Sequence, residues 1–199
     1  MEQTVTTKSV NRLSIRYGLL IGAISGGFSI IFYIINPLIQ YTNLFVPILS
    51  FIVVIALLII LAIDIRKKNG VYWKFGQAYL SLLIMSIFIV LIGIIINFII
   101  IKFVNPTLPS EINDAVMQAT NQRLEKFGMD QSQIDEATKQ FSNGEFIAKL
   151  QPTLFNQIKN FGIALIVYAI IDLILAAIIK KNKPPFNIHD ETTYVDPAV

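Results

Sequence analysis

The sequence predicts an all-α fold: an integral membrane bundle of four transmembrane helices, with a small helical extracytoplasmic insertion between helices three and four. Three observations lead to this prediction. More than half of the 199 residues are hydrophobic (54%), only 15% are charged, and the mean hydropathy is +0.64, which is too apolar for an ordinary soluble domain. Four long apolar segments contain no Lys or Arg, and the basic residues gather beside those segments.

Each apolar segment has close to the roughly 20 residues that a helix needs to cross about 30 Å of hydrocarbon. The predicted spans are Tyr17–Ile35, Leu44–Ile63, Ala78–Ile101 and Phe161–Ile179. The first span comes after a basic segment, as in a signal peptide, but it ends in "YIINPLIQY" without a small-residue cleavage site. We therefore expect an uncleaved span.

The basic residues predict the orientation of the spans. Ten of them lie in residues 1–16, in the loop 64–77 and in residues 180–199, whereas the short connection "NPLIQYTN" has none. Residues 102–160 contain six basic residues against seven acidic ones. Because Lys and Arg accumulate on the cytoplasmic side, we expect both termini and the loop 64–77 to be cytoplasmic and residues 102–160 to be extracytoplasmic.

The extracytoplasmic segment has two helix signatures. Ser110 can cap a helix that carries Ile112, Val116, Ala119 and Phe127 on one face, with Gly128 as its stop signal. Asp130 can cap a second helix, whose apolar positions are Ile134, Ala137 and Phe141.

Two further features concern the last span and the C-terminal residues. Pro152 suits the first turn of a helix that runs straight into the span 161–179. Residues 180–199 contain consecutive prolines, mixed charge and few apolar side chains, so we expect a disordered cytoplasmic tail.

Several classes of function have no support in the composition. There is no Cys and only one His, so disulfides, thiolate catalysis and multi-His metal sites are excluded within one chain. The basic residues do not form a separate binding face, which argues against nucleic acid. No nucleophile has an evident base partner, so we expect neither an enzyme nor a cofactor.

A stripe of small residues runs along the first span. Gly18, Gly22 and Gly26 come after Ser14 at intervals of four residues. Small residues at this spacing allow two helix backbones to approach closely in lipid. We expect close packing within the monomer; a seam between identical subunits and a conduction path are the alternatives.

The loop 64–77 combines basic and aromatic side chains at a span boundary. Arg66, Lys67, Lys68, Trp73 and Lys74 are the predicted lipid-interface anchor, in contact with anionic headgroups of the bilayer. Docking of a cytoplasmic partner is the alternative.

This loop also supports a resemblance to a known family. The "IRKKNG" turn, the "FGQA" entry into the third span and the long polar excursion before the fourth span resemble the bacterial membrane proteins grouped as domain of unknown function 4199. The resemblance covers nearly the whole chain. It implies a bacterial cytoplasmic (inner) membrane and supplies no ligand, reaction or catalytic residue.

Asp172 interrupts the last span. If Lys180 marks the boundary, Asp172 lies eight residues, or about 12 Å, inside the membrane, where an ionised carboxyl costs roughly 3 kcal/mol. No Lys or Arg is expected at that depth. We therefore expect a protonated carboxyl that hydrogen-bonds to a hydroxyl of Ser25, Ser86 or Tyr168. We expect Asp64 at the membrane interface and Asn97 near the outer end of the third span.

These observations leave two functional hypotheses. The first is a non-enzymatic membrane protein that serves as a structural or protein-interaction module, with an unknown membrane partner or as a homo-oligomer. The second is a small proton-coupled transporter or channel subunit in which Asp172 titrates. The sequence has too few polar groups at one depth to favour the second.

The predicted orientation can be tested with single cysteines, because the chain has none of its own. A membrane-impermeant thiol reagent should label Gln131→Cys in intact spheroplasts and should label Asn187→Cys only after lysis. The opposite pattern would reverse the assigned orientation.

Overall fold

The computed structural model describes residues 7–70 and 72–182, and this part of the chain is all-α, as the sequence predicts. Residues 1–6 of the predicted N-terminal segment and residues 183–199 of the predicted tail lie outside the described part. The elements are α1 (Thr7–Ile35), α2 (Ile39–Thr42), α3 (Phe45–Lys68), α4 (Phe75–Ile99), the π-helix η1 (Ile100–Val104), α5 (Leu108–Lys126), α6 (Gln131–Ser142), α7 (Glu145–Leu150) and α8 (Leu154–Ile179).

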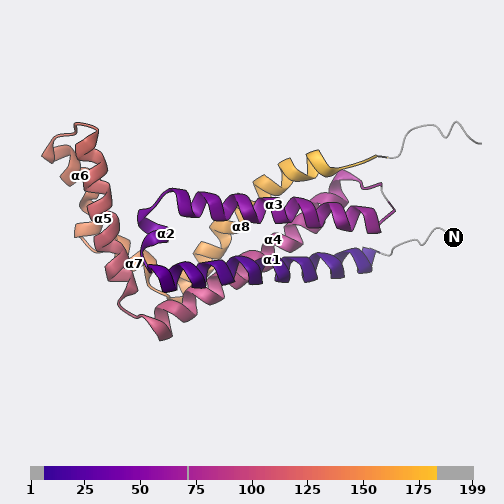
Figure 1. The fold of residues 1–199 in the computed structure, drawn as a ribbon, viewed down its shortest axis with the longest axis horizontal. Coiled ribbons are helices and arrows are strands. Elements are labelled where there is room, and N and C mark those ends of the chain that lie inside the picture. The colour runs from indigo at the N-terminus through magenta and orange to yellow at the C-terminus, as the bar shows by residue number, and fades with distance from the viewer. Residues whose placement is uncertain (1–6, 71, 183–199) are drawn as a thin grey trace, which may run out of the picture.

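Four long helices lie side by side along one axis, and α5, α6 and α7 gather at one end of them (Figure 1). We call this the cap end. The start of α1, the loop between α3 and α4 and the last turn of α8 lie at the opposite end, which we call the loop end. The most extensive contact is between α1 and α4, and the next is between α4 and α8. Helix α4 is therefore the centre of the bundle.

The four long elements, α1, α3, α4 with η1, and α8, are long and apolar enough to cross a membrane. Between 17% and 28% of the most apolar window of each is buried within the protein. The remaining apolar side chains face outward; Ile34 is 75% exposed and Phe45 is 82% exposed. Apolar surface on this scale would be unfavourable in water and is what lipid-facing helices present.

The helix ends agree with the predicted spans at Ile35 and Ile179, and α3 begins at Phe45, one residue after the predicted Leu44. The third span continues past Ile101 as η1, and the other ends at the loop end lie beyond the predicted ones. At the loop end α1 already begins at Thr7 and α3 continues to Lys68. The hydropathy pattern locates the hydrocarbon-length part of a helix, whereas the hydrogen-bonded helix continues into the polar flanks.

The small-residue stripe of α1 lies against α4. A Cβ atom added to Gly18 would lie 2.7 Å from the backbone oxygen of Met85, and one added to Gly22 would lie 2.6 Å from Cδ1 of Ile92. Gly26 likewise meets the side chain of Ile96. Ser14 is fully buried and donates a hydrogen bond to the Val10 carbonyl (3.0 Å). The stripe is thus used for packing inside the monomer.

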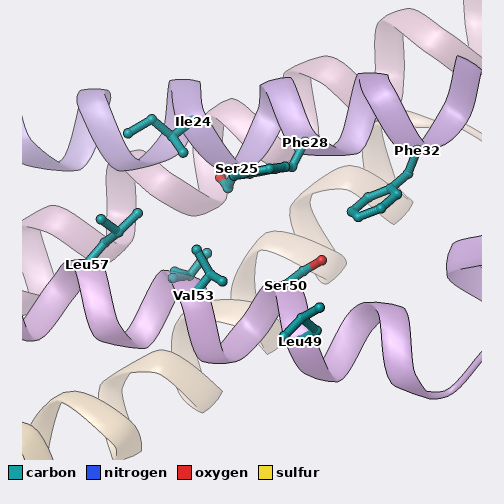
Figure 2. A pocket seen from close by; sticks show the side chains of 9 residues that line it. Ile24, Ser25, Phe28, Phe32, Leu49, Ser50, Val53 and Leu57 are labelled. Carbon is teal, nitrogen blue, oxygen red and sulfur yellow. The ribbon is translucent and has the colours of Figure 1, made fainter.

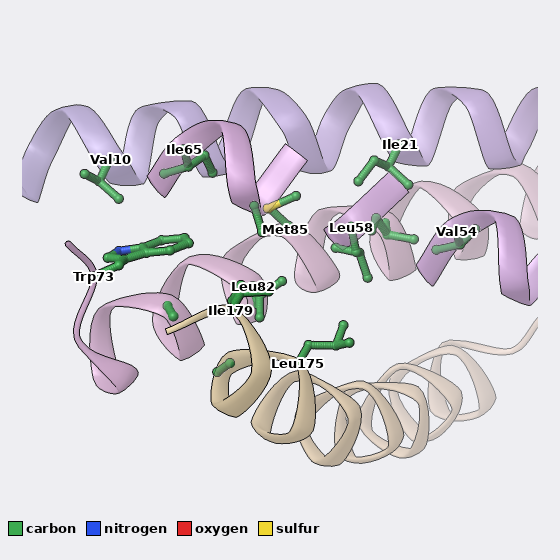
Figure 3. Close-up of a cluster of buried hydrophobic side chains, with 14 residues drawn as sticks. Val10, Ile21, Val54, Leu58, Ile65, Trp73, Leu82, Met85, Leu175 and Ile179 are labelled. Atoms are coloured by element: carbon green, nitrogen blue, oxygen red, sulfur yellow. The ribbon is translucent and has the colours of Figure 1, made fainter. Parts of the chain in front are cut away.

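The largest apolar cluster lies toward the loop end (Figure 3). Ile21 of α1, Leu58 and Ile65 of α3, and Leu82 and Met85 of α4 are fully buried in it. Leu175 and Ile179 bring α8 into the same cluster. A smaller cluster at the cap end holds η1 and α5 together through Ile101, Leu108 and Ile112.

Helix α5 begins earlier than its sequence signature predicts. The N-cap is Thr107, not Ser110, because Pro109 occupies the first turn and needs no hydrogen-bond acceptor for its nitrogen. Ile112 is buried, but Phe127 is 84% exposed, so the prediction that Phe127 lies on the buried face was wrong. Gly128 ends the helix as predicted: its φ of 77° is in the left-handed region, and its N–H bonds to the Glu125 carbonyl (2.9 Å).

Helix α6 starts as predicted at the Asp130 cap. The Asp130 carboxylate accepts a hydrogen bond from the Gln133 N–H (2.9 Å). The Ser132 hydroxyl and this N–H hold the pKa of Asp130 below its ordinary value. Ile134 and Phe141 are buried as expected, but Thr138 takes the place of the exposed Ala137 between them. The spacing 134, 138, 141 matches the helical period more closely.

Helix α8 runs without a break into the last span, as predicted. However, Pro152 precedes the helix instead of occupying its first turn, because Thr153 is the N-cap and accepts a hydrogen bond from the Asn156 N–H (3.2 Å).

The contact at Gly18 predicts an unequal effect of two alanine substitutions in α1. Gly18→Ala should lower the free energy of unfolding of the detergent-solubilised protein by about 1–3 kcal/mol, and with it the unfolding temperature. The reason is that the added Cβ meets the α4 backbone, which cannot rotate away. Gly27→Ala is the matched control, since nothing lies within 4 Å of its added Cβ. Equal unfolding temperatures for the two variants would contradict the close contact between α1 and α4.

Candidate functional site

Asp172 is fully buried in the bundle. It lies on the face of α8 that also carries the buried residues Leu175, Ala176 and Ile179, at spacings of three, four and seven residues. This face packs against α4. The helical period thus carries a carboxyl into the protein interior together with its apolar neighbours.

The carboxyl has no hydrogen-bond partner among the residues that the structure describes, because neither Oδ1 nor Oδ2 of Asp172 is bonded. The Ser86 hydroxyl of α4 lies beside the carboxyl, close enough to interact with it. The two groups nevertheless form no hydrogen bond of normal geometry, and the Ser86 hydroxyl is also buried without a partner in the described chain. Within the described part of the chain, no basic side chain forms an ion pair with Asp172.

The other two hydroxyls that we expected near Asp172 do not bond to it. Tyr168 is one turn away on α8, and its ring packs against that of Phe51 with centroids 6.3 Å apart. Ser25 donates to the Gly22 carbonyl of its own helix (3.1 Å). The structure therefore brings Ser86 to Asp172 and uses Ser25 elsewhere.

Ser25 lines a cavity of about 90 Å³ between α1 and α3. Figure 2 shows Ile24, Ser25, Phe28 and Phe32 on α1 facing Leu49, Ser50, Val53 and Leu57 on α3. The lining is almost wholly apolar. The Ser50 hydroxyl donates to the Val46 carbonyl (2.9 Å). Both serine hydroxyls therefore donate to carbonyls of their own helices and not into the cavity.

At the loop end, the predicted lipid anchor includes residues that join helices. Arg66 donates through Nη1 to the Ile179 carbonyl at the end of α8 (2.7 Å). Lys68 donates to Asp64 (2.6 Å) and to the Tyr17 hydroxyl (2.8 Å), and Tyr17 in turn donates to Asp64. These contacts connect α3 with α8 and with α1. Sequence reasoning assigned Arg66 and Lys68 to headgroups and missed the contacts with Ile179 and Tyr17, since these two residues lie far away in the chain.

Trp73 does not lie at the surface. Its side chain is fully buried, and Figure 3 shows the indole ring pointing into the bundle near Val10 and Ile65. Its backbone pairs with that of Lys181 through hydrogen bonds of 2.7 and 3.0 Å, which attaches the loop to the end of α8. An enclosed indole cannot contact headgroups, so Trp73 is not part of the anchor. Lys67, Lys68 and Lys74 are exposed, and their contact with headgroups stays a prediction.

The described residues contain no group of three or more His, Asp or Glu side chains that could hold a metal ion. Among the described residues of the bundle interior, Asp172 and Ser86 are the polar pair where α4 meets α8, and Tyr168 lies one turn away from Asp172.

Comparison with known protein families gives a match over most of the chain. The family described as "Protein of unknown function (DUF4199)" matches residues 16–181, which covers most of α1 and all of the other three long helices. No curated protein matches the chain significantly, and no solved structure does.

The unbonded state of Ser86 predicts the effect of removing its hydroxyl. Ser86→Ala should leave the unfolding temperature in detergent unchanged or raise it, because the buried hydroxyl forms no hydrogen bond that the change would break. A loss of about 0.6 kcal/mol or more, the typical contribution of an interhelical hydrogen bond in a membrane protein, would show that Ser86 bonds to Asp172.

Proposed function

The chain belongs to the DUF4199 family of proteins of unknown function, and we propose that it is a non-enzymatic, multi-pass membrane protein that binds a proton at Asp172 as part of a small carrier or channel.

The proposed setting is a bacterial cytoplasmic membrane with the loop end inside and the cap end outside. The four apolar helices support a membrane location. The exposed Lys67 and Lys74 lie at the loop end, where the predicted cytoplasmic segments meet, and they support contact with anionic headgroups there. On this orientation α5, α6 and α7 form the extracytoplasmic insertion.

One observation carries the proposal: a carboxyl in the middle of the bundle without a partner among the described residues. If Asp172 served only to hold α4 and α8 together, it would form a hydrogen bond across them. It forms none there, and an unsatisfied buried polar group costs about 1–3 kcal/mol. A group that costs stability and holds nothing together is better explained by a function that uses it.

The surroundings also fit proton binding. In the described chain no cation lies beside Asp172 to stabilise a carboxylate, so the neutral form is favoured in the apolar interior. Ionisation there becomes favourable when water or a cation reaches the carboxyl, which is the coupling that a proton-driven carrier needs. Ser86 is placed to bond to Asp172 in such a second state.

The alternative, a structural or protein-interaction module, is favoured by the exposed apolar side chains at the cap end. Phe127 of the cap is 84% exposed, although it lies outside the four spans. Such a side chain suits a membrane partner or a second copy of the chain. The stripe of α1 is already covered by α4, so a homo-oligomer would need another face.

Substitution of Asp172 separates the two functions. Asp172→Asn keeps the size of the side chain but cannot release a proton, so the variant should fold normally and lose proton flux in proteoliposomes under an imposed pH gradient. Infrared spectra of the wild type at neutral pH should contain the C=O band of a protonated carboxylic acid, which Asp172→Asn should remove.

Asp64→Asn is the matched control. Asp64 also lies on a long helix but bonds to Lys68 at the exposed loop end, so this variant should keep both the flux and the infrared band. Flux in Asp172→Asn equal to that of the wild type, or wild-type flux no greater than that of empty liposomes, would refute the proton-binding role and leave the module.

A further inference from the structure

A second cavity lies at the cap end of the bundle. Its volume is about 240 Å³, and it lies where α2, α4, η1, α7 and α8 meet. Since a water molecule takes about 30 Å³ in the liquid, the space corresponds to several water molecules or to one small polar group. The cavity is separate from Asp172, which lies twelve residues, or about 18 Å, further along α8 than its lining residue Asn160.

The polar lining of this cavity is rich in hydrogen-bond donors. Asn97, Gln157 and Asn160 contribute side-chain amides, Tyr41 a hydroxyl and Lys149 an ammonium group. Among the described residues no Asp or Glu lines it, so Lys149 is the charged side chain of the lining. One positive charge surrounded by neutral donors favours an anionic ligand.

Three of these donors are not used to hold the fold together, whereas the Tyr41 hydroxyl and the Asn97 amide interact with each other. In the described part of the chain, the side chains of Lys149, Gln157 and Asn160 form no hydrogen bond with other protein groups. Neighbouring polar side chains behave differently: Asn156 bonds to the Ala148 and Gln151 carbonyls at 2.7 and 2.9 Å, and Arg123 bonds to the Thr42 carbonyl at 2.7 Å. Lys149, Gln157 and Asn160 are thus available for a ligand.

Two lining residues complete the site. Burial raises the pKa of Tyr41, and the neighbouring Asn97 amide offsets part of this change, so the hydroxyl keeps its proton and can donate it. Gly93 of α4 leaves the wall open, since a Cβ added there would meet nothing within 4 Å. A larger side chain at position 93 can therefore start from the helix without a clash at its Cβ.

We propose that this cavity binds an anionic phosphate group, held by Lys149 and by the amides of Gln157 and Asn160. The group can come from a phospholipid head or from a soluble phosphorylated molecule. The position favours lipid, because Gln157 and Asn160 directly precede the apolar span that begins at Phe161, at the level where headgroups lie. This site lies at the opposite end from the basic loop and does not depend on a proton at Asp172.

Native mass spectrometry of the detergent-solubilised full chain tests the proposal with three probes. Phosphatidylglycerol should be retained, whereas diacylglycerol with the same acyl chains but no phosphate should not. Lys149→Ala should weaken the retention of phosphatidylglycerol by about tenfold, the effect of one charge-assisted hydrogen bond. Gly93→Leu should weaken it similarly by filling the cavity.

Glycerol 3-phosphate, the third probe, distinguishes the sources of the phosphate. Binding of glycerol 3-phosphate that is lost in Lys149→Ala supports a soluble ligand, whereas retention of phosphatidylglycerol alone supports a lipid. Both results uphold the phosphate site.

Two variants control for charge and for shape. Lys74→Ala removes an exposed positive charge at the loop end, and Gly27→Leu adds the same side chain at another open glycine. Both should bind like the wild type. If Lys149→Ala and Gly93→Leu, with unfolding temperatures like that of the wild type, also bind both phosphates like the wild type, the cavity is not a phosphate site.

Discussion

The close approach of α1 and α4 at Gly18 determines where the rest of the bundle can lie. Lipid supplies no hydrophobic force between helices, so the two backbones are held by direct packing, and the absence of a side chain at Gly18 brings the Met85 carbonyl against α1. The next residue, Ser86, lies beside Asp172 of α8. The contact of α4 with α1 is thus adjacent along the helix to the polar pair that α4 forms with α8. At the loop end, the hydrogen bonds of Lys68 and Arg66 attach helix α3 to α1 and to α8.

The sequence predicted those parts of the fold that depend on local composition and helical period. Apolar length located the four long helices, and the four-residue interval of glycines located the face of α1 that approaches α4. The Asp130 cap was predictable because its hydrogen bond joins residues three positions apart. The burial of Asp172 was predictable from its depth in a long apolar run. In each case the determining neighbours lie within one or two helical turns.

The features that sequence reasoning missed depend on distant residues or on competition between signals. A tryptophan beside basic residues at the end of a span is typical of a membrane interface. Trp73 is buried instead, next to a backbone pairing with Lys181, which lies more than a hundred residues later. Ser110 and Thr107 are both residue types that cap helices. The helix begins after Thr107 because Pro109, which lies between them, suits the first turn of a helix. The π-helical turn is closed by a hydrogen bond from the Asn105 N–H to the Ile100 carbonyl (2.8 Å), in a run of apolar residues without any distinguishing pattern. The cap-end cavity combines residues from five elements, so no single stretch of sequence predicts it.

Asp172 and the cap-end cavity lie along the same contact between α4 and α8. On α4, Ser86, Gly93 and Asn97 are spaced by seven and four residues, so they share one face of the helix. On α8, Tyr168 and Asp172 are one turn apart on the same face, and Asn160 lies about three turns nearer the cap end than Asp172. Packed side chains separate the two sites, and a group bound in the cavity could reach Asp172 only if α4 and α8 moved apart. Helix α4 is held against α1 at Gly18 and packs along α8, so the contact between α4 and α8 determines the position of both sites.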